Sequence, residues 1–351
     1  MRYTMEDIAR ICGVSRGTVN RAIYNKPGIN DETRKRILDK IAEVGYFPDR
    51  IAQNLVKGKS NAIGLVLHNM TNEFNTMMYD YVQQLCIERG YYLHFASSNS
   101  NPDLEAQNIQ RLIEYNVDGI IIFPIDRRGE LLRLALSKGI AIVQIQNLLP
   151  DLAAHSVTVD EHGAVHAAVT NLIQRGHRRI LFVEAMFGEY LFKNPGGRGR
   201  YNRYVYEERI RGYLDAMKEN GLKAVRSEIP VFFECRDTKD SAAGFARMVM
   251  QERQPTALMC YDDFTALWML TGLRSIGLRV PEDVSVVGFD DINTLRFVEP
   301  ALSTIHVNYA DVARRAGDIL FKQIEHPGQL QQVEFQANYL ERATVADGPV
   351  K

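Results

Sequence analysis

Two short stripes of apolar residues with helical spacing open the chain and are separated at Gly13. The apolar positions are Ile8, Ala9, Ile11, Cys12, Val14, Val19, Ala22 and Ile23. Apolar side chains three and four residues apart lie on one face of a helix. Two such helices joined by a tight glycine-containing turn predict a helix-turn-helix, whose second helix can lie in the DNA major groove.

Residues that cap helices surround these stripes. Thr4, with Asp7 three residues later, is typical of a capping box at the start of a helix. Ser15 follows the turn and is expected to cap the second helix. Asn30 precedes a third helical stripe, which Gly45 ends and Pro48 prevents from continuing. The pattern therefore predicts an all-α unit of three helices over residues 1–48.

Beyond residue 60, short apolar runs alternate with amphipathic stripes. The runs expected to be buried strands are Ala62–Leu67, Tyr92–Ala96, Gly119–Phe123, Ala141–Ile145, Ile180–Val183, Ala257–Cys260 and Val284–Phe289. The stripes expected to be helices include Met77–Glu88, Leu104–Tyr115 and Glu208–Asn220. Alternating strands and helices predict an α/β core, in which helices cover both faces of parallel sheets. About 290 residues are enough for two lobes.

Charge is divided unevenly along the chain. Residues 1–60 contain 12 Lys and Arg against 7 Asp and Glu, a net charge of +5, whereas the whole chain carries −1. A basic head on an otherwise acidic chain is expected if only the head meets phosphates. An ordinary three-helix domain that binds protein is the alternative, and this charge argues against it.

Motifs along the whole chain carry a resemblance to a known family. In the head they are MEDIARICGVSRGTVNRAI, NKPGINDETRKRILDKIAEVGYFPD and AQNLVKGKS; in the core they are NAIGLVL, VDGIIIFP, GHRRILFVE, RIRGYLDAM, LRVPEDVSVVGFDDI and PALSTI. The chain resembles the lactose-repressor/galactose-repressor family of bacterial transcriptional regulators. The resemblance implies a DNA-binding domain over residues 1–48 and a hinge helix with its linker over 49–60. Residues 61–351 would then form an effector-binding and dimerisation domain. This domain would have two doubly wound, periplasmic-binding-protein-like lobes, with chain crossings near residues 160, 291 and 325.

The resemblance also implies which residues contact DNA. Arg16 and Gly17 occupy the positions of the family's base-reading pair, where Arg16 could contact guanine through two hydrogen bonds. Gly17 departs from the usual side-chain-bearing residue and weakens the helix. Leu55 matches the leucine that wedges into the minor groove at the operator centre. The remaining candidates are Tyr3, Ser15, Thr18, Asn20, Arg21, Asn25, Gln53 and Asn54.

Ligands of open α/β sheets bind at the carboxyl ends of strands. Strand ends in this chain carry Phe123, Gln146, Asp160, Asp262 and Asp290. The resemblance supports Asp262 and Asp290 and adds Phe74, Asn75, Arg209 and Tyr309 as effector candidates. Asp263 is interpreted as a helix N-cap before residues 265–273.

The predicted cleft is rich in amides. Asn75 stands where many relatives have an aromatic residue, and Gln146–Asn147 replaces a more usual Asp-Arg pair. These departures favour a sugar or sugar derivative, and a nucleobase ranks lower because it would need more aromatic platforms. The segment 187–207 is longer than usual and carries Arg198, Arg200 and Arg203, so an acidic or phosphorylated metabolite stays open. A solvated surface loop is the alternative for this segment.

Other function classes lack their motifs. The sequence contains no Gly-x-Ser-x-Gly elbow, P-loop or zinc-ligand spacing, so we expect no enzyme, cofactor or metal. It has no signal peptide and no run of apolar residues long enough to span a membrane, which separates it from a secreted solute-binding protein. The hypothesis is a cytoplasmic repressor that binds a near-palindromic DNA operator as a homodimer. The last residues lack leucine heptads, so we expect no tetramer.

Overall fold

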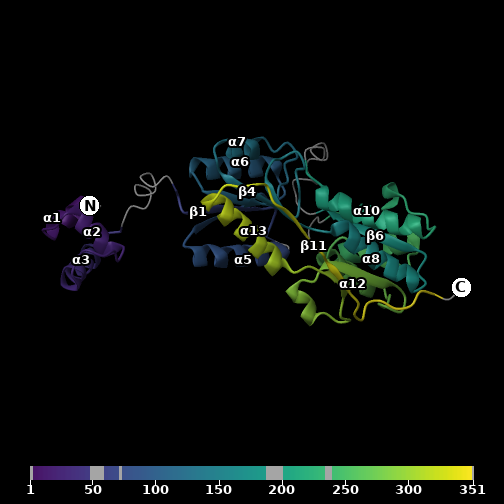
Figure 1. The fold of residues 1–351 in the computed structure, drawn as a ribbon. Coiled ribbons are helices and arrows are strands. Elements are labelled where there is room, and N and C mark those ends of the chain that lie inside the picture. The colour runs from purple at the N-terminus through teal and green to yellow at the C-terminus, as the bar shows by residue number, and fades with distance from the viewer. Residues whose placement is uncertain (1–2, 48–58, 71–72, 187–200, 234–238, 350–351) are drawn as a thin grey trace. The chain divides into compact units, whose positions relative to one another are not determined.

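A computed structural model of the protein describes residues 3–47, 59–70, 73–186, 201–233 and 239–349. The chain divides into two compact units, Met1–Ser60 and Asn61–Lys351. The expected hinge residues Gln53, Asn54 and Leu55 lie outside the described residues. Figure 1 draws the first unit in purple and the second from blue to yellow.

The described part of the first unit contains three helices: α1 (Met5–Ile11), α2 (Arg16–Ile23) and α3 (Asp31–Val44). Thr4 and Asp7 form the expected capping box, and the Ser15 side chain accepts a hydrogen bond from the Thr18 amide. Asn30 caps α3, and Gly45 ends it in a left-handed conformation. The helix-turn-helix predicted from the apolar stripes is confirmed.

The head is held together by a small core between its helices. Ile8, Val19 and Ile37 are fully buried, one from each helix. Gly13 has a φ of +64°, which explains why a glycine stands between α1 and α2. Arg34 on α3 donates to the backbone carbonyls of Arg21 and Lys26, which ties α3 to the end of α2.

Two six-stranded sheets form the second unit. The first has the order β11-β5-β4-β3-β1-β2 and contains β1 (Ala62–Leu67), β2 (Tyr92–Ser97), β3 (Gly119–Ile122), β4 (Ala141–Ile145), β5 (His155–Val159) and β11 (Gln332–Phe335). The second has the order β12-β10-β9-β8-β6-β7 and contains β6 (Ile180–Met186), β7 (Val231–Phe233), β8 (Ala257–Cys260), β9 (Ser285–Asp290), β10 (Ser303–His306) and β12 (Asn338–Leu340). Of these strands, β12 pairs antiparallel with β10 and the others pair parallel.

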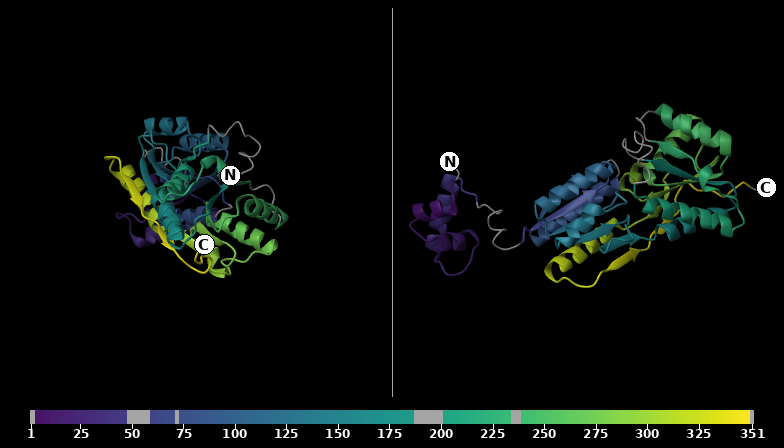
Figure 2. Two further views of the ribbon diagram at one scale, coloured as in Figure 1. Left: turned by 90° about the vertical axis from the view of Figure 1, so that its right-hand side faces the viewer. Right: turned by 90° about the horizontal axis from the view of Figure 1, so that it is seen from above.

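Helices cover both faces of each sheet, as Figures 1 and 2 show. Around the first sheet, α5 (Glu73–Arg89) and α13 (Tyr309–Glu325) lie on one face, and α6 (Pro102–Glu114) and α7 (Glu130–Ser137) on the other. Around the second, α8 (Glu161–Gln174) and α10 (Tyr204–Glu219) lie opposite α11 (Lys239–Arg253) and α12 (Asp263–Ser275). Two short 3-10 turns, η2 (Arg226–Glu228) and η3 (Asn293–Phe297), complete the described helices. The α/β architecture of two doubly wound lobes is confirmed.

The chain passes between the lobes after β5 near residue 160, between β10 and α13 at residues 307–308, and between β11 and β12 at residues 336–337. The last two positions correct the expected crossings near 291 and 325. The chain does not cross at 291 because β9 and β10 are parallel neighbours in the second sheet. It does not cross at 325 because α13 covers the first sheet and β11 then pairs with β5.

Several boundaries differ from those expected. Helix α10 begins at Tyr204 rather than Glu208, so the last residues of the long segment 187–207 are helical, while residues 187–200 lie outside the described chain. Buried Val205 fixes this start, because its backbone amide donates to the side chain of Asn147 in the first lobe.

Among the described residues, no helix is both long and apolar enough to span a membrane.

Candidate functional site

The first candidate site is the exposed surface of α2 and its neighbouring turns. Val19 and Ala22 face the core of the head, which leaves Arg16, Gly17 and Arg21 exposed. Of the other predicted DNA contacts, the exposed ones are Tyr3, Ser15 and Asn25, and the partly buried ones are Thr18 and Asn20. Ser15 and Thr18 also serve the helix itself, because their hydroxyls lie 2.9 Å apart within the N-cap.

Gly17 has no structural need to be glycine within the head. Its φ is not positive, and a Cβ built on it would meet only the Ser15 hydroxyl, at 3.6 Å. An alanine would therefore fit without strain.

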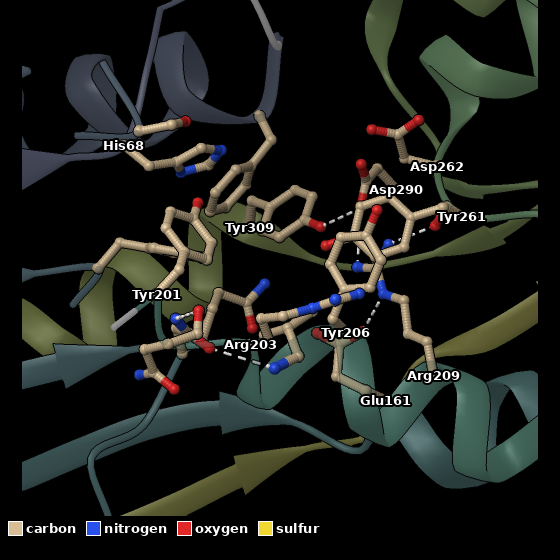
Figure 3. Close-up of a pocket in the computed structure, with 17 residues that line it drawn as sticks. His68, Glu161, Tyr201, Arg203, Tyr206, Arg209, Tyr261, Asp262, Asp290 and Tyr309 are labelled. Atoms are coloured by element: carbon tan, nitrogen blue, oxygen red, sulfur yellow. Dashed lines mark hydrogen bonds and ion pairs between the residues drawn. The ribbon is translucent and has the colours of Figure 1, made fainter. Parts of the chain in front are cut away.

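The second candidate site is a pocket between the two lobes of the second unit, drawn in Figure 3. It holds about 860 Å³ of space not filled by protein atoms, including its opening to solvent. Its walls come from the carboxyl ends of parallel strands, as expected for doubly wound sheets. Seven predicted effector residues line it: Phe74, Phe123, Gln146, Arg209, Asp262, Asp290 and Tyr309.

Two predicted effector residues do not line the pocket. Asn75 is fully buried, and its amide nitrogen lies 3.3 Å from both His68 Nε2 and Asn69 Oδ1. Asp160 is the N-cap of α8, where its carboxylate accepts a hydrogen bond from the Gly163 amide at 2.7 Å. Both side chains hold neighbouring residues in place and do not form part of the pocket surface.

A buried guanidinium organises one end of the pocket. Arg209 Nε donates to Glu161 Oε2 at 2.6 Å, Nη2 lies 3.4 Å from Asp290 Oδ1, and Nη1 donates to the carbonyl of Tyr261 at 2.5 Å. Tyr309 donates its hydroxyl to the same Asp290 oxygen at 2.6 Å. Each nitrogen of this guanidinium therefore already contacts the protein.

Two further aspartates lie beside this network. Asp262, and not Asp263 as the sequence suggested, is the N-cap of α12, because its Oδ1 accepts from the amide and hydroxyl of Thr265. Asp263 is also buried and accepts from the Ile292 amide and the Thr304 hydroxyl. Burial, followed by the nearby charge of Asp290, raises the pKa of Asp262 to about 7.

Aromatic rings, rather than amides, dominate the lining. They belong to Phe74, Phe123, Tyr201, Tyr206, Tyr261 and Tyr309, with the imidazole of His68 among them. The rings of Tyr206 and Tyr261 stack with centroids 4.3 Å apart, and the guanidinium of Arg203 covers Tyr206 at 4.5 Å. The expectation of an amide-rich cleft with few aromatic platforms is therefore wrong.

The amides that do line the pocket are largely used within the protein. Asn147 donates to the carbonyls of Pro124 and Asn202, and its own oxygen accepts from the Val205 amide. Asn202 donates to the carbonyls of Pro124 and Leu148. These bonds leave little amide capacity for a ligand.

The same bonds tie the lobes together along residues 201–205, which lead into the first turn of α10 in the second lobe. The backbone amide of Asn202 donates to the carbonyl of Ile125 at 2.7 Å, and Tyr201 forms a β-bridge with Asp126. The ion pair of Arg203 with Glu184 on β6 anchors this segment to its own lobe. We call residues 201–205 the strap, because they join the first lobe to the second beside the pocket.

Four buried polar atoms at the pocket have no hydrogen-bond partner in the described part of the protein. They are His68 Nδ1, Gln146 Oε1, Glu161 Oε1 and the Tyr206 hydroxyl. Burial lowers the pKa of His68 to about 4, so its ring is neutral at neutral pH. Buried polar groups in proteins are nearly always hydrogen-bonded, so these atoms are suited to a bound molecule. No three His, Cys, Asp or Glu side chains converge as a metal site in the described residues.

Several lining residues were not predicted, notably His68, Glu161, Tyr206 and Tyr261. His68 directly follows the first strand, and Glu161 and Tyr261 each adjoin a predicted strand-end aspartate, so the rule on strand ends could have included them. Tyr206 belongs to the long segment 187–207 that the sequence singled out for its arginines, but its place at the pocket depends on the strap.

Comparisons with known proteins match both units. The family model "Bacterial regulatory proteins, lacI family" matches residues 4–49, and the model "Periplasmic binding protein-like domain" matches residues 169–345. A relative named HTH-type transcriptional repressor PurR, from Vibrio atlanticus, is 30% identical over 97% of this chain and 98% of its own length. The ribose operon repressor of Haemophilus influenzae is 28% identical over 93% of each chain.

A solved structure shares the fold along nearly the whole chain. The lac repressor dimer bound to operator and the anti-inducer ONPF has a TM-score of 0.81 with 20% identity. The match covers 99% of this chain and 100% of that one.

Proposed function

Since this chain belongs to the lacI family of bacterial regulatory proteins, we propose that it is a repressor whose effector is a sugar or sugar derivative bound in the pocket between the lobes. Membership makes the chain a DNA-binding transcriptional regulator under small-molecule control, and not an enzyme. We place its action in the cytoplasm, where a bacterial operator lies.

The unpartnered polar atoms of the pocket carry the proposal for the effector. Gln146 Oε1 is an acceptor, Glu161 Oε1 accepts or donates according to the protonation of its carboxyl group, and His68 Nδ1 and the Tyr206 hydroxyl complete the set. Leaving such an atom buried without a partner costs about 1–3 kcal/mol. A molecule with several hydroxyls would satisfy them while lying against the aromatic lining, which is the usual composition of a small-molecule site.

The charges at the pocket argue against an acidic or phosphorylated effector. Arg209 is paired with Glu161 and Asp290, and Arg203 is paired with Glu184. An anion at either guanidinium would compete with a buried carboxylate that is already paired with it. Arg198 and Arg200 lie outside the described residues.

A nucleoside is the second candidate, and the aromatic rings favour it. Phe74 and Tyr309 have centroids 4.5 Å apart, and Phe123 lies 4.5 Å from His68. These rings supply the platforms whose expected absence ranked a nucleobase lower. A nucleoside would also bring ribose hydroxyls, and a ribose operon repressor is among the relatives.

For DNA, we propose that two copies pair through residues 61–351 and place two heads on a near-palindromic operator. The exposed surface of α2 supports base reading by Arg16, with phosphate or base-edge contacts from Thr18, Asn20 and Arg21. The related lac repressor structure is a dimer bound to operator, which supports the same assembly here. The hinge proposal rests on Gln53, Asn54 and Leu55, outside the described residues.

The test is thermal stabilisation of the purified protein against neutral sugars, nucleosides, sugar acids and sugar phosphates. A ligand at 100 times its Kd stabilises the folded protein by about 2.7 kcal/mol. A neutral sugar that raises the Tm and also changes operator affinity supports the main proposal. A nucleoside that does both, with no sugar active, selects the second candidate, and a response confined to acids or phosphates contradicts both.

A further inference from the structure

His68 directly follows β1 at the pocket, and the two nitrogens of its ring have different surroundings. The imidazole packs against Phe123, with ring centroids 4.5 Å apart, and its centroid lies 6.5 Å from that of Phe74. Nε2 contacts the side chain of Asn75, whereas Nδ1 is buried at the pocket without a hydrogen-bond partner in the described part of the chain. The nitrogen that carries the hydrogen therefore decides what His68 offers to a bound molecule.

The neighbours of Asn75 fix the direction of its amide. Asn75 is fully buried on α5, and its Nδ2 lies 3.3 Å from His68 Nε2 and 3.3 Å from Asn69 Oδ1. An amide nitrogen has two hydrogens, one for each of these two neighbours. If the amide were turned over, its oxygen would face the oxygen of Asn69, and two acceptors would repel each other. Asn75 therefore donates to His68.

A donor at Nε2 leaves one place for the hydrogen of His68. Burial lowers the pKa of His68 to about 4, so the ring is neutral at neutral pH and carries a single hydrogen on one nitrogen. Nε2 accepts from Asn75 and cannot hold that hydrogen, which leaves it on Nδ1. The atom that His68 presents to the pocket is then an N–H donor.

We propose that Asn75 is a positioning residue for effector specificity: it holds His68 with its hydrogen on Nδ1, so that the first lobe reads a hydrogen-bond acceptor on the effector. A hydroxyl, a ring oxygen or a carbonyl of a neutral sugar or nucleoside is such an acceptor. A group that can only donate, such as an ammonium, does not fit. This inference rests on the proposed function and adds the residues that select one group of the effector.

The opposite state of His68 fits these surroundings less well. With its hydrogen on Nε2, the ring would point a donor at the amide nitrogen of Asn75, which is itself a donor. A protonated ring would carry hydrogens on both nitrogens, at the cost of burying a charge beside Phe123. The hydrogen on Nδ1 is the state that satisfies Asn75 without a buried charge.

The direct test is the NMR spectrum of the ¹⁵N-labelled histidine side chains in full-length, ligand-free protein at neutral pH. The signals of His68 are assigned from their loss in His68→Leu. The expected result is a hydrogen on Nδ1 and none on Nε2. A hydrogen on Nε2 in the wild type, alone or together with one on Nδ1, overturns the proposal without reference to any effector.

Substitutions of Asn75 test whether this residue sets the state of His68. Asn75→Asp replaces the donor by a carboxylate, which only accepts when ionised, so Nε2 of His68 should gain a hydrogen. Asn75→Leu buries no charge and serves if Asn75→Asp does not fold; it should give a mixture of both forms. If Nδ1 remains the only nitrogen with a hydrogen in both variants, Asn75 is not the positioning residue.

Asn108→Asp is the matched control for these variants. Asn108 is also a buried amide of the first lobe, but its nitrogen donates to the backbone carbonyl of Ser97. The substitution therefore buries the same group without changing the contact at His68. The hydrogen of His68 should stay on Nδ1.

The effector side is tested with D-ribose, D-glucose and adenosine, whose Kd values are derived from the rise in Tm. His68→Leu removes the donor and should weaken binding about tenfold, the effect of one lost hydrogen bond. His68→Asn places an amide nitrogen near the position of Nδ1 and should recover part of this loss.

The outcomes separate this inference from the function on which it rests. A probe that stabilises the wild type and His68→Leu equally overturns the contact with His68 and leaves the effector-controlled repressor standing. A hydrogen on Nδ1 of the free protein that moves to Nε2 in Asn75→Asp, with no response to any neutral sugar or nucleoside, supports the role of Asn75 at His68 and contradicts the proposed effector classes.

Discussion

The head and the pocket place their functional side chains in opposite ways. In the head, Arg16 and Arg21 project from one short helix into solvent, and the core behind them consists of other residues. In the pocket, Arg209 and its partners come from several elements and are themselves buried. Function and folding are therefore separable in the head, whereas in the pocket the same side chains contribute to both.

The largest expected effect tests that coupling. Arg209→Ala leaves Glu161 and Asp290 buried without their cation, so it should lower the free energy of unfolding of the second unit by about 3–5 kcal/mol. Urea unfolding measures the loss. Arg211→Ala on the same helix is the control, because Arg211 is exposed and its ion pair with Glu208 contributes about 1 kcal/mol or less. Equal losses in the two variants would contradict the coupling.

Arg16→Ala tests the opposite behaviour of the head. Because Arg16 is exposed, we expect no loss of stability, but a loss of about 1–3 kcal/mol in binding to a preferred operator selected from random DNA. Fluorescence anisotropy on that operator and on variants changed at single base pairs gives the measurement. A relaxed preference at one base pair indicates base reading, whereas a uniform loss on every sequence would identify a phosphate contact instead.

Asn202→Ala tests whether the strap joins the lobes or only shapes a loop. The change removes two hydrogen bonds to carbonyls of the first lobe and should cost about 2 kcal/mol. A second contact between the lobes lies away from the strap: the Thr294 amide of the second lobe donates to Glu73 of the first lobe. Its stability shows whether a change in the strap is felt at another point between the lobes.

Hydrogen exchange at Thr294 should accelerate in Asn202→Ala if the strap holds the lobes. In the control Asn220→Ala, which removes only a hydrogen bond to the α10 carbonyl of Ala216, hydrogen exchange at Thr294 should stay unchanged. Faster exchange confined to the strap itself would mean that the strap does not act on the other lobe contact.

The pH dependence of stability tests the buried carboxyl group of Glu161. Its pKa is about 7 in the folded protein, against an ordinary 4.5, because burial outweighs the charge of Arg209, while Asp290 and Asp160 raise it further. Between these values the folded state holds the proton that the unfolded chain has lost. The contribution of this group is therefore fully present below the ordinary pKa and is lost as pH rises toward 7.

Urea unfolding of wild type and Glu161→Gln over this range isolates the effect. The wild type should lose stability relative to the variant as pH rises, with a slope of at most one proton, about 1.4 kcal/mol per pH unit. Curves that stay parallel would contradict the raised pKa.

Gly17→Ala has the smallest expected effect on folding. A Cβ fits at this position, and the change should stabilise the head by about 0.5–1 kcal/mol. Thermal unfolding of the head measures the gain. If operator affinity falls at the same time, the glycine serves a close approach of the α2 backbone to DNA; unchanged affinity would remove that explanation.

Much of the fold could be predicted because its signals are local. The N-caps at Thr4, Ser15 and Asn30 and the turn at Gly13 depend on residues a few positions apart. Strands β1, β4 and β8 were predicted with their observed bounds, because buried parallel strands are continuous apolar runs. Polar β5 and β11, by contrast, lie next to each other at one side of the first sheet, and their pairing depends on residues more than 170 positions apart.

The sequence by itself therefore determined the family, the helix-turn-helix and most strand-end residues of the pocket. The tertiary structure alone decided which side chains remain available there. Asn147 looks like a ligand amide in the sequence but is used, together with Asn202, between the lobes. Tyr206 and Glu161, by contrast, reach the pocket with unpartnered atoms. The physical reason is that caps and turns form between neighbouring residues, whereas the hydrogen bonding, burial and charge of a cleft depend on which distant segments the fold brings together.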